Sequence, residues 1–380
     1  MKNKKTIAAI LLILIFVISG CKSENNKKEH VNQNNGKAEK KITDQQISFA
    51  GNRMCESEDG FYYGSSMRVM YYDKALGINT ILCFNSTCNH QGNECTGVFN
   101  NFLTETIVYN GGSIYITGYE KKSGDVYDVY LYRVSLDGGV REKLFRVAVY
   151  ETEMLQDPMI IHRGYYYFTE GSGDEDGNVR ICRRKLEKNS EIETVYEADK
   201  GCFAAISNLV CYEQNLYFEY EYCLDEKEDK YDFYLMKTDV CSLKTEVAAK
   251  DFTINWYYIC GNDKILAYTI DGSIKEYKPD INEVKTILKL EKDKFYDFSS
   301  DGDYIYFKES GRIEVYGMDG EKLQDVETDM EDVPGDFLYG NKEYLFCLCV
   351  TDDLEFILYK GNKKLLETGE FKWEKCENGV

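Results

Sequence analysis

The sequence predicts an all-β fold, a β-propeller of about seven four-stranded blades, preceded by an apolar N-terminal segment and a polar linker. Two observations support this prediction. A short Tyr-rich strand recurs seven times, and each copy follows a turn signal. Three further short strands accompany most copies, and four short strands in every 40–50 residues are typical of a propeller blade.

The recurring strand defines the blades. Its copies occupy residues 59–65, 111–117, 163–169, 214–220, 262–269, 301–308 and 341–348. Composition fits strands, because the chain has 32 Tyr and 19 Phe but only three Pro. Tyr suits a pleated, half-buried surface, whereas Pro cannot donate to a ladder. Seven copies favour seven blades, and six or eight blades stay open if a terminal blade is shared.

Residues 1–20 have the pattern of a signal peptide. A basic start, MKNKK, precedes about 14 apolar residues, which are too few for a comfortable membrane span. The segment ends in ISGC (18–21), which resembles the lipobox of bacterial lipoproteins. The resemblance implies that Cys21 becomes the N-terminus, carries acyl chains such as palmitate and anchors the protein to the outer face of the cell membrane. The alternative is an uncleaved transmembrane helix.

Residues 21–45 form a second region, rich in Lys, Asn, Glu and Gln. Because it has almost no apolar side chains, we expect a flexible tether that can lie near an anionic lipid surface. The chain as a whole has a net charge of −20, and the acidic excess falls on the third region, residues 46–380. An acidic domain repels nucleic acid, so we expect no nucleic-acid partner.

Parts of the third region resemble a known repeat. The segments YIYFKESGRIEVYGMDGE (304–321) and VYLYRVSLDGG (129–139) look like the YWTD propeller repeats of the low-density-lipoprotein-receptor type. Residues 50–375 are also similar to Gram-positive bacterial lipoproteins with a propeller domain of unknown function. Those proteins tend to have an early Cys-x-His step, matched here by Cys88 and His90. The resemblance implies the fold more than an activity.

Three Cys and one His lie within the segment LCFNSTCNHQGNEC (82–95). Cys83, Cys88, His90 and Cys95 supply the four N or S ligands that zinc takes in a closed site. The spacing lacks the usual C-x2-C pair, and one residue between Cys88 and His90 is a short step for two ligands. Because disulfides persist outside the cell, the sequence favours a loop disulfide, with a metal second and free thiols third. We expect this loop to cross from the first blade to the second.

The sequence also offers a second pairing, between Cys55 and Cys376. Cys55 falls in the first strand and Cys376 near the end of the chain. A propeller brings its first and last blades together, so a disulfide between these residues would close the ring.

The leading functional hypothesis is a lipid-anchored, extracytoplasmic propeller that binds a protein, glycan or small molecule without catalysis. The sequence has no nucleophile elbow, phosphate loop or His-rich metal set. Two alternatives stay open, a glycan lyase or hydrolase that uses paired acids and a metal-binding lipoprotein that uses the Cys/His loop. The leading hypothesis implies no cofactor, with zinc at the Cys/His loop as the alternative, and we expect a monomer.

Overall fold

The computed structural model describes residues 54–379, except 66, 93, 100–102, 125, 151–158, 172–178, 199–203, 226–229, 261–263, 279–282, 291–296, 310, 331–334 and 352–355. The predicted signal peptide, tether and Cys21 lie outside the described residues. No helix within the described part of the chain has the length and apolar character needed to cross a membrane.

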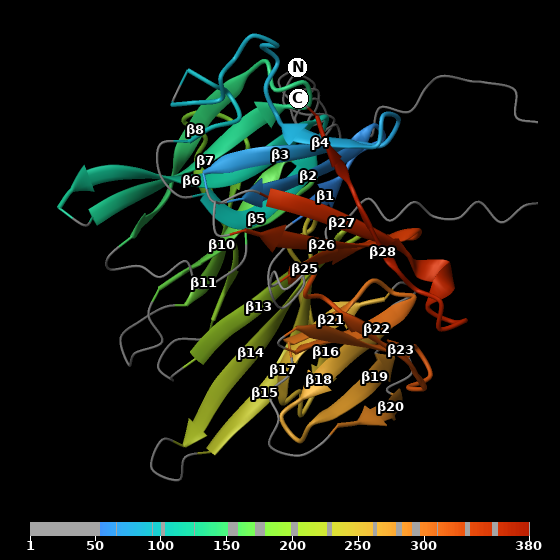
Figure 1. Ribbon diagram of the computed structural model, residues 1–380. Coiled ribbons are helices and arrows are strands. Elements are labelled where there is room, and N and C mark those ends of the chain that lie inside the picture. Colours follow the sequence, from blue (N-terminus) through green and yellow to red (C-terminus); the bar gives the residue numbers. More distant parts are fainter. Residues whose placement is uncertain are drawn as a thin grey trace, which may run out of the picture. The chain divides into compact units, whose positions relative to one another are not determined.

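The described strands form seven sheets arranged in a ring, which is a β-propeller (Figure 1). Each blade has four strands, and the sheet of blade 1 has the short strand Glu377–Asn378 added as a fifth. Blades 1 to 3 contain β1 (Met54–Glu56), β2 (Gly60–Ser65), β3 (Arg68–Asp73), β4 (Ile78–Ile81); β5 (Leu103–Asn110), β6 (Ser113–Ser123), β7 (Val126–Ser135), β8 (Arg141–Tyr150); β9 (Ile160–His162), β10 (Tyr165–Glu170), β11 (Arg180–Lys185) and β12 (Ile192–Glu197). Blades 4 and 5 contain β13 (Ala204–Tyr212), β14 (Asn215–Asp225), β15 (Lys230–Asp239), β16 (Thr245–Lys250); β17 (Ile254–Ile259), β18 (Ile265–Thr269), β19 (Ser273–Lys278) and β20 (Glu283–Lys289). Blades 6 and 7 contain β21 (Asp297–Ser300), β22 (Tyr304–Glu309), β23 (Arg312–Gly317), β24 (Lys322–Glu327); β25 (Gly335–Gly340), β26 (Tyr344–Val350), β27 (Phe356–Asn362) and β28 (Trp373–Lys375).

The predicted fold class is confirmed. Every Tyr-rich segment found in the sequence forms the second strand of a blade, from β2 in blade 1 to β26 in blade 7. Neighbouring strands within each blade are antiparallel, as in the pairing of Tyr63 with Met70 between β2 and β3. The turn signals fall between strands, so a local pattern was enough to place them.

The hydrophobic core lies between successive blades. One cluster joins Phe61 of blade 1 to Phe346 of blade 7, with ring centroids 4.6 Å apart. Another joins blades 1 and 2, and a further one runs from blade 3 to blade 6. The recurring tyrosines supply much of this core, since Tyr63, Tyr167 and Tyr217 are almost fully buried. Burying a large apolar side chain contributes about 1.5–3 kcal/mol, so these blade contacts hold the ring together.

The C-terminus closes the ring on the outside of blade 1. The short strand β29 (Glu377–Asn378) follows β28 of blade 7 and pairs in parallel with β4. Asn79 of β4 is buried, and its carbonyl accepts a hydrogen bond of 2.8 Å from the Gly379 amide. The same residue accepts from the Tyr63 hydroxyl at 2.9 Å and donates to Asn378 at 3.3 Å. The first and last blades therefore meet, as the repeat predicts.

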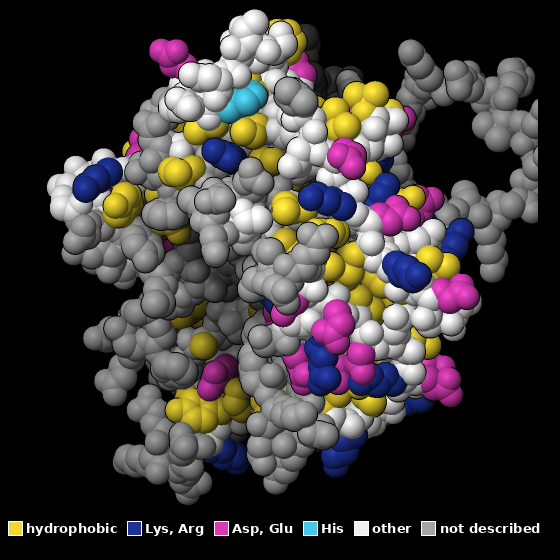
Figure 2. Space-filling model, in the orientation of Figure 1, with side chains coloured by type: hydrophobic (Ala, Val, Ile, Leu, Met, Phe, Trp, Pro, Cys, Tyr) yellow, Lys and Arg dark blue, Asp and Glu magenta, His cyan; other side chains and the backbone are white. Residues whose placement is uncertain are grey.

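Charged side chains of opposite sign lie next to one another on the surface. Figure 2 shows acidic and basic groups mixed over the region of β22 and β23. Glu314 there accepts from Arg312 at 3.4 Å and from Lys322 at 3.0 Å. The acidic composition is thus partly neutralised by local pairs, which are individually weak at an exposed surface.

Candidate metal centre

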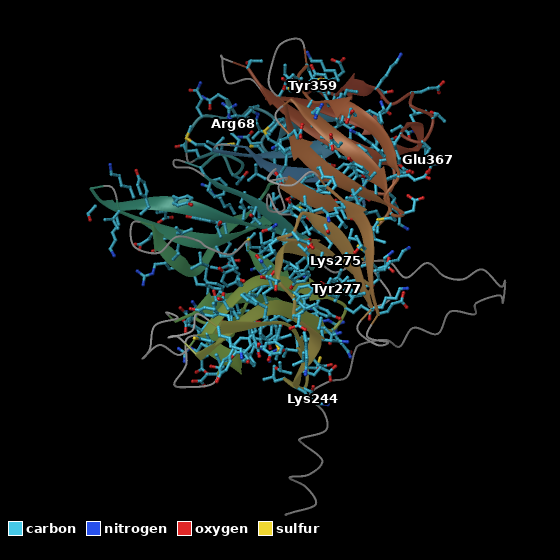
Figure 3. All side chains as sticks on the ribbon, turned by 90° about the horizontal axis from the view of Figure 1, so that it is seen from below. Arg68, Lys244, Lys275, Tyr277, Tyr359 and Glu367 are labelled. Carbon is cyan, nitrogen blue, oxygen red and sulfur yellow. The ribbon has the colours of Figure 1, made fainter. Side chains whose placement is uncertain are left out.

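The Cys/His loop is an excursion from the outer strand of blade 1. Leu82, just after β4, donates its amide to the Val69 carbonyl at 2.8 Å. The chain leaves the sheet at Cys83 and returns at Gly97, whose carbonyl accepts from the Val69 amide at 2.9 Å. Val98 then bridges to Arg68, which Figure 3 labels on β3. We call residues 83–96 the metal loop. It does not itself cross between blades as the sequence suggested, because the chain rejoins blade 1 before leaving for β5.

The four predicted ligands converge within this loop. One ligand atom each from Cys83, Cys88, His90 and Cys95 lies within 4.8 Å of the other three. The Cys95 thiol is 3.5 Å from Nδ1 of His90. Cys95 is buried, while the other three side chains are half-buried. The cluster could therefore hold a metal ion.

Local backbone chemistry explains how such closely spaced residues converge. The Asn85 carbonyl accepts from the Cys88 amide at 3.0 Å, and its side chain accepts from the Thr87 amide at 3.0 Å. His90 has a φ of 54°, which turns the chain sharply after Cys88. The His90 amide then donates to the Cys88 sulfur at 3.3 Å. The single-residue step between these two ligands is thus accommodated by a left-handed backbone.

Ionisation differs among the thiols of the metal loop. Burial opposes the charged form of Cys83, but hydrogen bonds with the Asn85 backbone and the neighbouring thiols lower the pKa of Cys83 overall. Burial raises the pKa of Cys95 to about 12. The lowered pKa favours the thiolate form of Cys83, which is the form of cysteine that binds a metal ion.

The end of the metal loop packs on blade 2. The Thr96 hydroxyl donates to the Gly138 carbonyl in the turn between β7 and β8. The Arg141 guanidinium donates to the Val98 carbonyl and lies 4.6 Å from the centre of the Phe99 ring. These contacts tie the outer strand of blade 1 to the next blade, so the loop joins the two blades even though it does not cross between them.

The sequence favoured a disulfide among the three loop cysteines, and the structure has all three as free thiols. The sequence also paired Cys55 with Cys376, and the structure does not bring these residues together. Cys55 packs against the cluster between blades 1 and 2, whereas Cys376 is buried in the cluster between blades 7 and 1. Both thiols are free, and burial raises the pKa of Cys376 to about 12. Blades 1 and 7 are joined instead by β29 and by the hydrophobic cluster around Phe61 and Phe346.

Sequence reasoning found the four ligands but missed the residues that position them. Asn85, Thr96, Gly138 and Arg141 were not singled out. Asn85 could have been found, since Asn followed by Ser and Thr is a typical turn sequence. The contacts with blade 2 span more than 40 residues, and no local pattern predicts them.

No family model and no curated protein sequence matches the chain. Solved structures do match. An oligogalacturonate lyase in complex with manganese has a TM-score of 0.50 at 11% identity, over 73% of this chain and 77% of that one. The periplasmic gluconolactonase PpgL of Pseudomonas aeruginosa has a TM-score of 0.48 at 11% identity, over 84% and 96%. The WD40 propeller domain of Doa1 has a TM-score of 0.44 at 11% identity, over 86% and 96%. At this identity the lyase supports the fold alone.

Proposed function

Taking the seven-bladed propeller as the scaffold, we propose that this chain is a lipid-anchored extracytoplasmic binding protein with a structural zinc site at its rim. The observation that carries the metal assignment is the convergence of Cys83, Cys88, His90 and Cys95 within 4.8 Å. Zinc bonds of about 2.0–2.3 Å place tetrahedral ligands roughly 3.5–4 Å apart, so small side-chain movements complete the site.

The donor set favours zinc over other biological metals. Thiolates and imidazole are soft or borderline ligands, which suit zinc and disfavour magnesium or calcium. Four protein ligands fill a tetrahedral shell and leave no position for water or substrate, which is the arrangement of structural sites. Zinc would then fix the metal loop and, through Thr96 and Val98, the contact with blade 2.

The cellular role rests on different support. The lipobox-like end at Cys21 and the lysine-rich tether favour attachment to the outer face of a membrane. A propeller groups the loops of its blades on shared faces, and this arrangement favours a binding role, with a protein, glycan or small molecule as ligand. Turnover of a polysaccharide by the purified protein would instead favour the lyase or hydrolase alternative.

Elemental analysis tests the metal assignment. The protein purified under reducing conditions should contain one zinc per chain. Thiol labelling should find the three loop cysteines protected until a chelator is added. Cys88→Ser, His90→Ala and Cys95→Ser should each lower zinc occupancy, whereas Cys241→Ser, at an exposed thiol in a turn of blade 4, should not. A metal-free chain with a disulfide in residues 83–95 would reject the zinc site in favour of the disulfide interpretation.

A further inference from the structure

A groove of about 740 Å³ lies between blades 1 and 2 and has Cys83 of the metal loop in its wall. Blade 1 contributes the turns at 57–60 and 73–77 and the end of β4, and blade 2 contributes the turn between β7 and β8. This volume is within the range of about 300–1000 Å³ found for ligand pockets. We call it the rim groove.

Aromatic rings form part of the groove lining. The rings of Tyr62 and Tyr71 lie with their centres 4.8 Å apart. Tyr62 is buried and donates its hydroxyl to the Leu136 carbonyl of blade 2 at 3.3 Å, so it is fixed in place. Tyr71 is half-buried and borders the groove. An exposed aromatic face attracts an ammonium or guanidinium group.

Three exposed apolar side chains come shortly after groove-lining residues in the chain. Leu76 is 69% exposed, Phe84 is 72% exposed and Val140 is 61% exposed. Each follows closely on a residue that lines the groove, namely Ala75, Cys83 and Asp137 respectively. Among the described large hydrophobic residues, these are three of the four that exceed 60% exposure. Exposed apolar side chains next to groove-lining residues can contact a docked segment.

The charge of the rim groove is negative. Glu58, Asp59, Asp73 and Asp137 line it. The Ser135 hydroxyl and the Gly139 amide lower the pKa of Asp137, which keeps that carboxylate ionised. The one lysine in the lining, Lys74, is bound to Glu56 at 2.7 Å. The groove therefore offers uncompensated carboxylates to a cationic partner.

We propose that the rim groove docks an extended, basic segment of a partner protein, with lysine or arginine side chains alternating with apolar ones. The carboxylates match the cationic residues, the face of Tyr71 stacks on one of them, and Leu76, Phe84 and Val140 cover the apolar ones. This inference rests on the proposed zinc site, because Cys83 and Phe84 belong to the metal loop, and zinc would hold that wall in place.

Fluorescence anisotropy tests the proposal with the full mature chain in detergent. The probe is a labelled peptide that alternates lysine with leucine. It should bind saturably, less tightly at high salt, and at least tenfold more weakly after Glu58→Lys with Asp59→Lys or after Phe84→Ser. The matched control, Glu191→Lys with Ile192→Ser, changes an exposed acidic and an exposed apolar residue on blade 3 and should bind like the parent. Equal weakening by the control would overturn the proposal.

Two further measurements separate the rim groove from the zinc site and from the chain's own tether. Zinc content is measured in each preparation. A zinc-loaded chain that does not bind the peptide rejects the docking site alone, and peptide binding by a zinc-free chain rejects the dependence on zinc. A synthetic peptide of residues 22–41 should not compete with the probe, and competition would reassign the groove to this lysine-rich segment. A peptide with glutamate in place of lysine should not bind.

Discussion

At the scale of single residues, Lys363 is the most buried described cation, with a side chain 2% exposed. Its ammonium group donates to Asp301 at 2.6 Å, to Asp303 at 3.3 Å and to the Asn341 carbonyl at 2.6 Å. Tyr306 donates its hydroxyl to the same Asp301 carboxylate at 2.5 Å. These bonds join blade 6 to blade 7 across the turns between strands. A fully bonded buried charge of this kind is destabilising to remove, because its partner is left unpaired.

Replacing this lysine should therefore be costly. Lys363→Ala should lower the free energy of unfolding by about 3 kcal/mol, measured by urea denaturation. Lys364→Ala, at the exposed neighbouring position, should change it by less than about 0.5 kcal/mol. Equal stability of the two variants would show that the buried ion pair contributes nothing to the ring.

Asp271, in the turn between β18 and β19, shows how a neighbouring hydroxyl lowers the pKa of a carboxylate. The Thr269 hydroxyl donates to its carboxylate, and the pKa of Asp271 falls to about 2. Because the folded-state pKa is below the usual value, the turn gains stability above about pH 4 and loses it as pH falls towards 2. Thr269→Val should raise the pKa of Asp271 towards 4 in an NMR titration, whereas Thr245→Val on β16 should leave it unchanged. An unaltered pKa after Thr269→Val would contradict the role of this hydroxyl.

At the scale of elements, the turn between β7 and β8 fits closely under the metal loop. Gly138 has a φ of 69°, and a Cβ there would lie 2.8 Å from the Leu82 carbonyl and 2.9 Å from the Cys83 amide. Gly111, in the turn between β5 and β6, has a φ of 57°, and a Cβ there would meet nothing within 4 Å. The two glycines share the same backbone requirement and differ in the space around them.

This difference supplies a matched pair of variants. Both Gly138→Ala and Gly111→Ala incur about 1 kcal/mol for a left-handed alanine. Only Gly138→Ala should displace Cys83, and we expect it to weaken cobalt binding at least tenfold, measured by the thiolate–cobalt absorption. Similar cobalt affinities for the two variants would mean that the turn does not position the ligand.

The terminal strand β29 is the other element with a defined role. Deleting residues 377–380 removes its ladder with β4. The side-chain amide of the buried Asn79 loses its acceptor on Asn378, and the Asn79 backbone carbonyl loses the Gly379 amide. We expect the free energy of unfolding to fall by about 2 kcal/mol and the amides of β4 to exchange faster with deuterium. Asn378→Ala, which removes one side-chain bond only, should have the smaller effect. Unchanged exchange in β4 after the deletion would contradict a closing role for β29.

At the scale of the whole molecule, the fold was predictable and the long-range contacts were not. Each blade can be predicted from local sequence, because a Tyr-rich strand such as 163–169 comes with its own turn residues and its own strand pattern of side chains. The ligand set was also local, with four ligands in fourteen residues. The buried ion pair of Lys363 with Asp301 and the contact of Thr96 with Gly138 join segments 62 and 42 residues apart, and only the closed ring brings them together. The proposed pairing of Cys55 with Cys376 depended on which face of blade 1 each thiol occupies. The two thiols belong to different clusters, and the sequence does not indicate this.

Metal removal should leave the propeller intact. Among the described residues, the hydrophobic clusters lie between blades and contain none of the four ligands. Leu82 and Phe99, on either side of the metal loop in the chain, belong to the cluster between blades 1 and 2. Chelation should therefore preserve the far-ultraviolet circular dichroism spectrum and lower the melting temperature by only about 2–4 °C, while residues 83–96 lose protection from deuterium exchange. Loss of the whole β signal on chelation would contradict a peripheral site.

The position of β29 has a mechanical consequence. In blade 1 the first described strand, β1, is the innermost of its sheet, and β29 is bonded to the opposite edge. Tension applied to the chain before residue 54 reaches β1 first and does not pass through the strand that seals the ring. If the protein is held to a surface by its N-terminal segment, a pulling force on that segment does not load the pairing of β29 with β4 directly.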